Sequence, residues 1–240
     1  MSLPRYAEYK DSGINWLGDV PTHWDILPLK RACNVFPSNI DKKSYEGEEP
    51  VRLCNYTDVY YNDLISDDMP FMDATATSEQ VRKFTLRAGD TIVTKDSETA
   101  DDIAISAYVP TDLPGVVCGY HLSMIRPTSL VDGRFVKRLF DSAYTKACCH
   151  VSANGLTRVG LGQYALDNLV LPFPPKDEQR IIAEFLDRET AKIDALIESV
   201  VGGDIGQLAD GKSLVGLLKE RRSALISATV TGKIDVRKAA

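Results

Sequence analysis

Residues 1–175 carry short hydrophobic runs that are separated by glycine, proline, asparagine and aspartate. Such runs, rich in β-branched and aromatic residues and bounded by turn formers, are typical of strands. Two stretches, 78–84 and 133–150, instead have helical patterns. The expected strands are 50–61, 90–95, 103–109, 116–127 and 168–173. The pattern therefore predicts a mixed α/β domain with an irregular sheet.

Residues 176–240 have a different pattern, because they contain no proline and their hydrophobic residues recur at heptad spacing. This spacing predicts a helical seam of the coiled-coil type. The first set of seam positions is Leu186, Ile193, Val200 and Leu214. The second set, three or four residues further on, is Leu196, Ile197, Leu217, Leu218, Ala224 and Leu225.

The ends of the predicted helices are marked by residues with known positional preferences. Pro175 suits a helix entry, and the acidic Asp177 and Glu178 then fall in the first turn, where the helix dipole favours negative charge. Four glycines in 202–212 each weaken a helix by about 1 kcal/mol relative to alanine. We therefore expect one helix from about 176, a broken stretch at 202–212, and a second helix to about 229, with Gly232 as its cap. The fold class is α+β, with a domain at 1–175 and a helical arm at 176–240.

The charge distribution argues against a strongly basic nucleic-acid binder. The 240 residues carry a net charge of −6. The arm is balanced, with 11 basic and 11 acidic side chains, so the whole excess falls on residues 1–175. A stand-alone DNA-binding domain is usually basic, because phosphate contacts supply much of its affinity. If this chain reads DNA, its basic residues are clustered or a partner supplies much of the backbone contact.

The five cysteines and three histidines show no metal-ligand spacing, and reduced thiols are expected. No apolar run is long enough to span a bilayer, and the first residues carry no apolar signal core. These features predict a cytoplasmic protein without a metal or membrane contact.

Several segments together resemble the specificity subunits of type I restriction–modification systems. The opening YKDSGINWLGDVPTHWDILPLKRA resembles the usual start of that family. AGDTIVTK, GYHLSMIRP and GLTRVGL resemble strand signals of its target-recognition domain. LPFPPKDEQRIIAEFLDRETAKIDALIE and LLKERRSALISATVTGKIDV resemble the helical region that follows this domain. Family members usually have two such modules, so this chain resembles a natural half-subunit or one half of a longer protein.

The resemblance implies a non-catalytic, sequence-specific DNA-binding role. In that family, helical arms pair antiparallel, adenine methyltransferase subunits that use S-adenosylmethionine dock on them, and a translocase–nuclease subunit joins for cleavage. The expected partners are therefore double-stranded DNA, these subunits and a second copy of the chain, which would direct the complex to a bipartite site. No cofactor is expected on the chain itself.

The alternatives come from other functional classes. The chain could be a recognition domain detached from a fused restriction–methylation enzyme, but no cofactor-binding glycine loop, nucleophile elbow or P-loop is present. It could also be an assembly or antagonist protein that pairs through its helices without reading DNA, and the acidic charge of residues 1–175 favours this alternative.

Candidate DNA-reading residues are polar or aromatic side chains near the ends of predicted strands, where loops can present them to base edges. Each has a structural alternative, such as an ordinary surface cation, a core aromatic ring or a hydrogen-bonded histidine. The candidates are Arg52, Asn55, Tyr56, Lys83, Arg87, Lys95, Tyr120, His121, Asn154, Thr157 and Arg158. Lys95 and Arg158 are preferred, because both lie in turn-bounded polar stretches.

The hydrophobic seam is expected to bind a partner rather than to pack on its own domain. A continuous helix over 176–201 would be about 39 Å long, and a domain of this size has no room for two such helices. The expected interface for dimerisation and subunit docking is Leu186, Ile193, Leu196, Ile197, Val200, Leu214, Leu218 and Leu225.

Overall fold

A computed structural model describes residues 3–201 and 213–238. The largest sheet is antiparallel, with the strand order β4–β11–β7–β9. Its strands are β4 (Cys33–Pro37), β11 (Leu122–Pro127), β7 (Thr91–Thr94) and β9 (Ser106–Tyr108). A second sheet has the order β10–β5–β6, in which β10 runs parallel and β6 antiparallel to β5. Its strands are β10 (Val116–Cys118), β5 (Glu49–Cys54) and β6 (Met72–Ala76).

Three antiparallel strand pairs complete the β structure of the described residues. They are β1 (Tyr9–Asp11) with β2 (Asp19–Pro21), β3 (Asp25–Pro28) with β13 (Val170–Phe173), and β8 (Asp96–Ser97) with β12 (Val159–Gly160). The short helices are α1 (Tyr56–Tyr60), α2 (Ser78–Phe84), α3 (Gly133–Asp141), α4 (Ala143–Ser152) and α5 (Gln163–Asp167). Single 3-10 turns cover Leu29–Arg31 and Ala100–Asp102.

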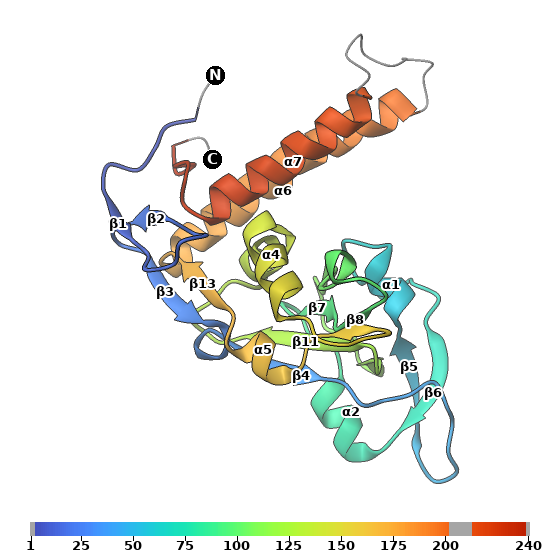
Figure 1. Ribbon diagram of the computed structural model, residues 1–240. Helices are drawn as coiled ribbons and strands as arrows, with labels where there is room; N and C mark the ends of the chain where they lie inside the picture. Colours follow the sequence, from blue (N-terminus) through green and yellow to red (C-terminus); the bar gives the residue numbers. More distant parts are fainter. Residues whose placement is uncertain (1–2, 202–212, 239–240) are drawn as a thin grey trace.

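Two long helices form the arm. They are α6 (Lys176–Val201) and α7 (Leu214–Val230), which pack side by side and extend away from the sheets (Figure 1). The predicted fold class, a mixed α/β domain followed by a helical arm, is confirmed. The glycine-bearing stretch 202–212, which was predicted to be broken, lies outside the described residues.

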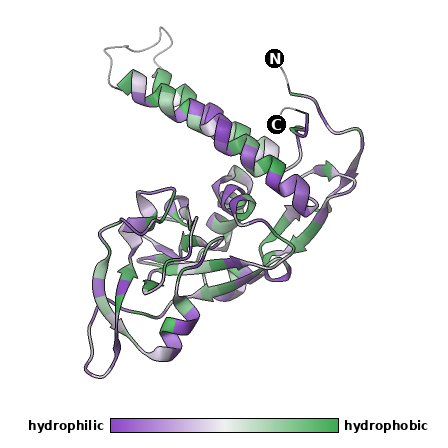
Figure 2. Cartoon of the chain, turned by 180° about the vertical axis from the view of Figure 1, so that it is seen from behind, coloured by the Kyte–Doolittle hydropathy of each residue, from purple (hydrophilic) through white to green (hydrophobic). Residues whose placement is uncertain are grey.

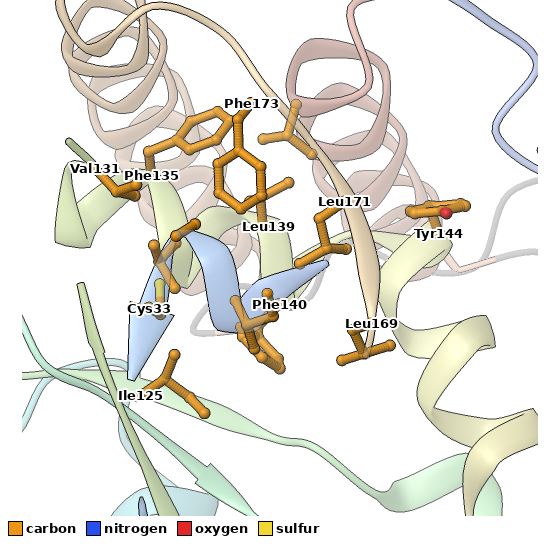
Figure 3. Packing of buried hydrophobic residues seen from close by; sticks show 14 of the residues in the cluster. Cys33, Ile125, Val131, Phe135, Leu139, Phe140, Tyr144, Leu169, Leu171 and Phe173 are labelled. Atoms are coloured by element: carbon orange, nitrogen blue, oxygen red, sulfur yellow. The ribbon is translucent and has the colours of Figure 1, made fainter. Parts of the chain in front are cut away.

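The hydrophobic core has two parts. One lies between the two larger sheets and includes residues of β5, β10, β7 and β11. The other joins β4 and β11 to α3, α5, β13 and the first half of α6, with Phe135, Phe140 and Phe173 among its largest members (Figure 3). Residues of α6 and α7 pack into this second core together with the N-terminal part of the chain. The predicted domain boundary after residue 175 stays a prediction.

A buried carboxylate fastens the N-terminal segment to the start of the arm. Glu178, 7% exposed in the first turn of α6, accepts hydrogen bonds from the Tyr6 hydroxyl at 2.7 Å and the Trp24 indole at 3.1 Å. Its other oxygen lies 2.7 Å from Nε2 of His23. Burial and the neighbouring Glu178 both raise the pKa of the Tyr6 hydroxyl well above its usual range. The acidic residue expected at the helix start therefore also organises tertiary packing.

The end of α7 returns to the same place. Gly232 has φ of +73°, and the amides of Gly232 and Lys233 donate to the carbonyls of Thr229 and Ala228, which is the Schellman pattern. A Cβ on Gly232 would lie 2.3 Å from Cδ of Pro21. The predicted glycine cap is thus confirmed, and the residue also permits close packing on the N-terminal segment.

Three predicted elements were wrong in part. The run 116–127 is two strands in different sheets, β10 and β11, because the chain turns between them, where the backbone amide of Leu122 donates to the carbonyl of Gly119 at 3.0 Å. The run 50–61 is a strand only to Cys54. Helix α1 begins directly after it, because the Asp58 carboxylate accepts a hydrogen bond from the backbone amide of Asn55 at 2.7 Å and caps the helix. The stretch 133–150 is two helices, because the Ser142 hydroxyl accepts from the Thr145 amide and caps a new helix.

All five cysteines carry free thiols, and Cys148 alone is partly exposed. Within residues 3–201 and 213–238, no helix is both long and apolar enough to cross a bilayer. The same described ranges hold no cluster of three or more histidine, cysteine, aspartate or glutamate side chains that could bind a metal ion.

Candidate nucleic-acid interface

Three segments far apart in the sequence meet at strand pair β8–β12. Lys95 directly follows β7, and its backbone amide donates to the carbonyl of His121 at 3.0 Å. Its own carbonyl accepts from the amide of Leu161, just after β12, at 2.8 Å. These bonds bring the predicted segments DTIVTK, GYHLS and ANGLTRVG to one place, beside the end of β7 and helix α1 (Figure 1).

A surface pocket of about 520 Å³ opens where these segments meet. Five of the predicted DNA-reading residues line it: Lys95, Tyr120, His121, Asn154 and Arg158. A smaller pocket of about 90 Å³ adjoins it through Tyr120 and His121, and adds the predicted Asn55 and Tyr56. We call the residues lining these two pockets, together with loop 154–160, the reading face.

Lys95 has a structural role at the centre of this face. Its ammonium donates to the carbonyl of Ser38 at 2.8 Å and lies 4.6 Å from the centroid of the Tyr120 ring. Burial lowers the pKa of Lys95. The side chain therefore holds Tyr120 in place, and only part of its hydrogen-bonding capacity faces solvent.

Tyr120 and His121 are held in a fixed arrangement by a tight turn. A Cβ on the preceding Gly119 would lie 2.6 Å from the carbonyl oxygen of Cys54, so only glycine allows this approach. Nδ1 of His121 lies 3.0 Å from Oδ2 of Asp96, and its ring meets the Tyr120 ring edge-on. Tyr120 remains half-exposed at 50%.

Loop 154–160 is closed at its base by two backbone hydrogen bonds between Asn154 and Gly160, at 3.1 and 2.8 Å. Gly155 has φ of +144°, and a Cβ there would lie 1.9 Å from the carbonyl oxygen of Arg158. Thr157 and Arg158 are exposed at its tip, where no hydrogen bond or ion pair within the described residues engages the Arg158 guanidinium. This arginine is the predicted residue best placed for an external contact.

Asn55 and Tyr56 form the neighbouring wall. The Asn55 side chain donates to the carbonyl of Leu53 at 3.3 Å, and the Tyr56 ring stacks on Tyr60 with centroids 5.4 Å apart. The Tyr60 hydroxyl donates to Asp102 at 2.8 Å, which raises the pKa of Tyr60 to about 12. Aromatic rings and hydrogen-bonding groups thus alternate along the face.

Three candidates do not join this face. Arg52 points from β5 to Asp67, with its guanidinium 2.6 Å from the carboxylate, so it is engaged in an ion pair. Lys83 lies on α2, at the bottom of the view in Figure 1 and apart from β8, with its ammonium 5.1 Å from the Phe84 ring. Arg87 precedes β7, whereas Lys95 follows it. These three residues lie on a strand, a helix and a loop elsewhere in the fold, and the sequence gives no indication of which segments share an edge.

Sequence reasoning also missed residues of the face. Asp96 and Gln163 line the larger pocket, and Lys42 lines the smaller one. Leu156, at the tip of loop 154–160, is fully exposed at 106%. Its signal was present in the sequence, as a leucine in an otherwise polar turn between Gly155 and Thr157.

The predicted arm interface is only partly free. Leu186 and Ile193 are 0% and 6% exposed and belong to the chain's own packing, which corrects their assignment to an external surface. Helix α6 packs against both α3 and α7, and these two helices account for the burial. The five predicted positions with intermediate exposure are Ile197, Val200, Leu214, Leu218 and Leu225. Leu196 is 53% exposed, and hydrophobic residues recur to the far end of the arm (Figure 2).

Comparison with known proteins gives a consistent family. The family described as type I restriction modification DNA specificity domain matches residues 47–199. The specificity subunit of the EcoKI type I restriction enzyme of Escherichia coli K12 is 23% identical over 225 residues, covering 90% of this chain and 44% of that protein.

Two solved structures share the fold. The HsdS subunit from Thermoanaerobacter tengcongensis is 16% identical with a TM-score of 0.55, and the match covers 94% of this chain and 48% of that one. A chain from a structure on complex assembly and conformational transition of the type I R-M system is 16% identical with a TM-score of 0.56. That match covers 94% of this chain and 49% of that one. The chain thus spans about half the length of the relatives it matches.

Proposed function

The chain belongs to the family of type I restriction modification DNA specificity domains, and from that premise we propose that its reading face recognises one part of a DNA target site. The observation that carries this proposal is the convergence of Lys95, Tyr120, His121, Asn154 and Arg158 around one pocket. Sequence readout needs hydrogen-bond donors, acceptors and apolar groups that are held in fixed positions. The backbone bonds among β7, β12 and the Gly119 turn supply that rigidity.

The mixed charge of the reading face indicates that a partner subunit contributes to DNA binding. Asp96 pairs with His121, and Asp102 accepts from Tyr60, so acidic groups stand among the cations. Such a surface gains little from phosphate attraction, which dominates non-specific DNA affinity. We expect the isolated chain to bind DNA weakly, and its methyltransferase partner to supply most of the backbone contacts and therefore most of the salt dependence.

The proposed partners follow from the family. The chain would recruit adenine methyltransferase subunits, which use S-adenosylmethionine, and a translocase–nuclease subunit, without performing chemistry itself. All of these components act on cytoplasmic DNA.

The arm would pair with a second copy of itself. An antiparallel pairing of identical arms is self-complementary and places two reading faces in opposite orientation. One module reads too few base pairs to mark a unique genomic site. The target would then be an interrupted palindrome whose spacer is set by the arm.

The test is selection from a random duplex library by the full chain, alone and with its adenine methyltransferase. Enrichment of one interrupted palindrome, sharpened by the methyltransferase, is the expected result. Methyl transfer from labelled S-adenosylmethionine by the pure chain would instead favour the detached enzyme domain. If the chain self-associates but selects no sequence, either alone or with the methyltransferase, the result would favour an assembly or antagonist protein that does not read DNA.

A further inference from the structure

Leu156 occupies an unusual position on the reading face. Its side chain is 106% exposed, more than any other large hydrophobic residue among the described ones. Full exposure of a leucine contributes nothing to the fold, because the hydrophobic effect stabilises only apolar surface that is removed from water. Single exposed leucines are common on protein surfaces, so exposure alone is not an argument for function.

The backbone around Leu156 supplies a second, independent argument. The loop is closed by the paired bonds between Asn154 and Gly160, and Gly155 adopts a conformation in which any side chain would collide with the carbonyl of Arg158. The apolar side chain is thus presented on a fixed support rather than on a flexible tail. A fixed apolar group is suited to a contact that depends on position.

The surroundings of the loop identify the kind of ligand. Asn154 and Arg158, on either side of Leu156, both line the larger pocket together with Lys95 and Tyr120. A protein partner would favour a continuous apolar patch, whereas Leu156 stands between groups that hydrogen-bond. The major groove of DNA offers this combination, with hydrogen-bonding base edges beside the C5-methyl groups of thymine.

We propose that Leu156 is a specificity-determining residue that contacts a thymine C5-methyl group in the major groove, while Asn154, Thr157 or Arg158 bonds to neighbouring base edges. This inference rests on the proposed DNA-reading function and adds to it a base preference. It predicts a thymine at one fixed position of each half-site. Burying one methyl group is worth about fourfold in affinity.

The experiment removes that methyl group alone. Sites selected by the full chain with its methyltransferase are resynthesised with each thymine replaced in turn by uracil, which keeps every hydrogen-bonding group. We expect one replacement to weaken wild-type binding about fourfold. Leu156→Ala should bind the thymine and uracil duplexes equally, and Leu156→Met should retain part of the difference.

Leu130→Ala is the matched control. Leu130 is 72% exposed, but it follows the end of β11 opposite to His121, so its loss should leave the thymine–uracil ratio at the wild-type value. A Leu156→Ala variant that keeps this ratio would overturn the inference. An equal loss on both duplexes would also overturn it, because a leucine wedged between base pairs does not sense the methyl group. Absence of any selected sequence in wild type would instead count against the DNA-reading function itself.

Discussion

The ammonium nitrogen of Lys95 lies 4.6 Å from the centroid of the Tyr120 ring while it donates to the carbonyl of Ser38. A single cation therefore joins the end of β7 to the turn before β11 and to the segment after β4. Lys95 therefore has two roles: it fixes the position of Tyr120 on the reading face, and it contributes a positive charge to that face.

Replacement of Lys95 by alanine should consequently affect both stability and binding. The Ser38 carbonyl loses its side-chain donor and Tyr120 loses its support, so we expect a loss of about 1 kcal/mol in the free energy of unfolding. DNA affinity should fall as well. Urea denaturation and DNA titration of the same preparation measure the two effects. A Lys95→Ala variant with wild-type DNA affinity would show that this residue is outside the interface.

Removal of the Glu178 carboxylate should loosen the attachment between the N-terminal segment and the arm. Glu178→Ala leaves the buried Tyr6 hydroxyl and Trp24 indole without their acceptor. We expect a loss of about 3 kcal/mol or more, measured by urea denaturation. Glu184→Ala, which removes an exposed carboxylate from the same helix, should stay within about 0.5 kcal/mol of wild type. Equal stability of the two variants would contradict this role for Glu178.

The carboxylate of Asp63 should make the contact between domain and arm sensitive to acid. It bonds to Lys137 of α3 at 2.7 Å and to Arg222 of α7 at 3.1 Å. Burial raises the pKa of Asp63. The attraction of the Lys137 and Arg222 cations lowers it by more, so the net pKa lies below its usual value. Its stabilising contribution is then present above a pH of about 4 and disappears as the pH falls through the lowered pKa.

The corresponding measurement compares wild type with Asp63→Asn at several pH values. At neutral pH the variant should be less stable by under about 1 kcal/mol, because the side chain of Asp63 is largely exposed. The difference should shrink as the pH falls below about 4 and through the lowered pKa of Asp63. A difference that stays constant, or that grows on acidification, would exclude this ion pair as the cause.

Self-association through the arm is best tested at Leu196. This side chain is 53% exposed, so Leu196→Asp should abolish pairing in light scattering while leaving the unfolding transition nearly unchanged. Ile193→Asp is unsuitable for the purpose, because it places a charge in the chain's own core and should lower stability by several kcal/mol. If Leu196→Asp pairs as strongly as wild type, the dimer contact lies elsewhere.

The sequence predicted the fold class, the positions of α2, α6 and α7, and the glycine cap at Gly232, because these depend on local periodicity and capping chemistry. It did not predict that Leu186 and Ile193 would be internal. A heptad stripe has the same appearance whether its partner is another chain or a neighbouring helix such as α3. Only the tertiary arrangement separates the two cases.

The reading face shows the same limit. Lys95 and Arg158 could be selected from the sequence because both lie in polar turns beside strand signals. Arg52 and Lys83 satisfied similar criteria, yet Arg52 pairs with Asp67 and Lys83 lies on α2. Which strand ends share an edge depends on the β4–β11–β7–β9 order and on the β8–β12 pair, and neither is specified by local pattern.

The central claim, that the chain binds DNA through this face, is tested most directly by comparing Arg158→Ala with Arg87→Ala. Both changes remove one exposed arginine, but only Arg158 lines the pocket. Affinity for a selected duplex is measured against salt concentration, with the methyltransferase present. We expect Arg158→Ala to weaken binding about fivefold or more and, if it contacts a phosphate, to reduce the salt slope by about one, while Arg87→Ala matches wild type. Equal affinities for Arg158→Ala and wild type, or a larger loss from Arg87→Ala, would contradict the claim.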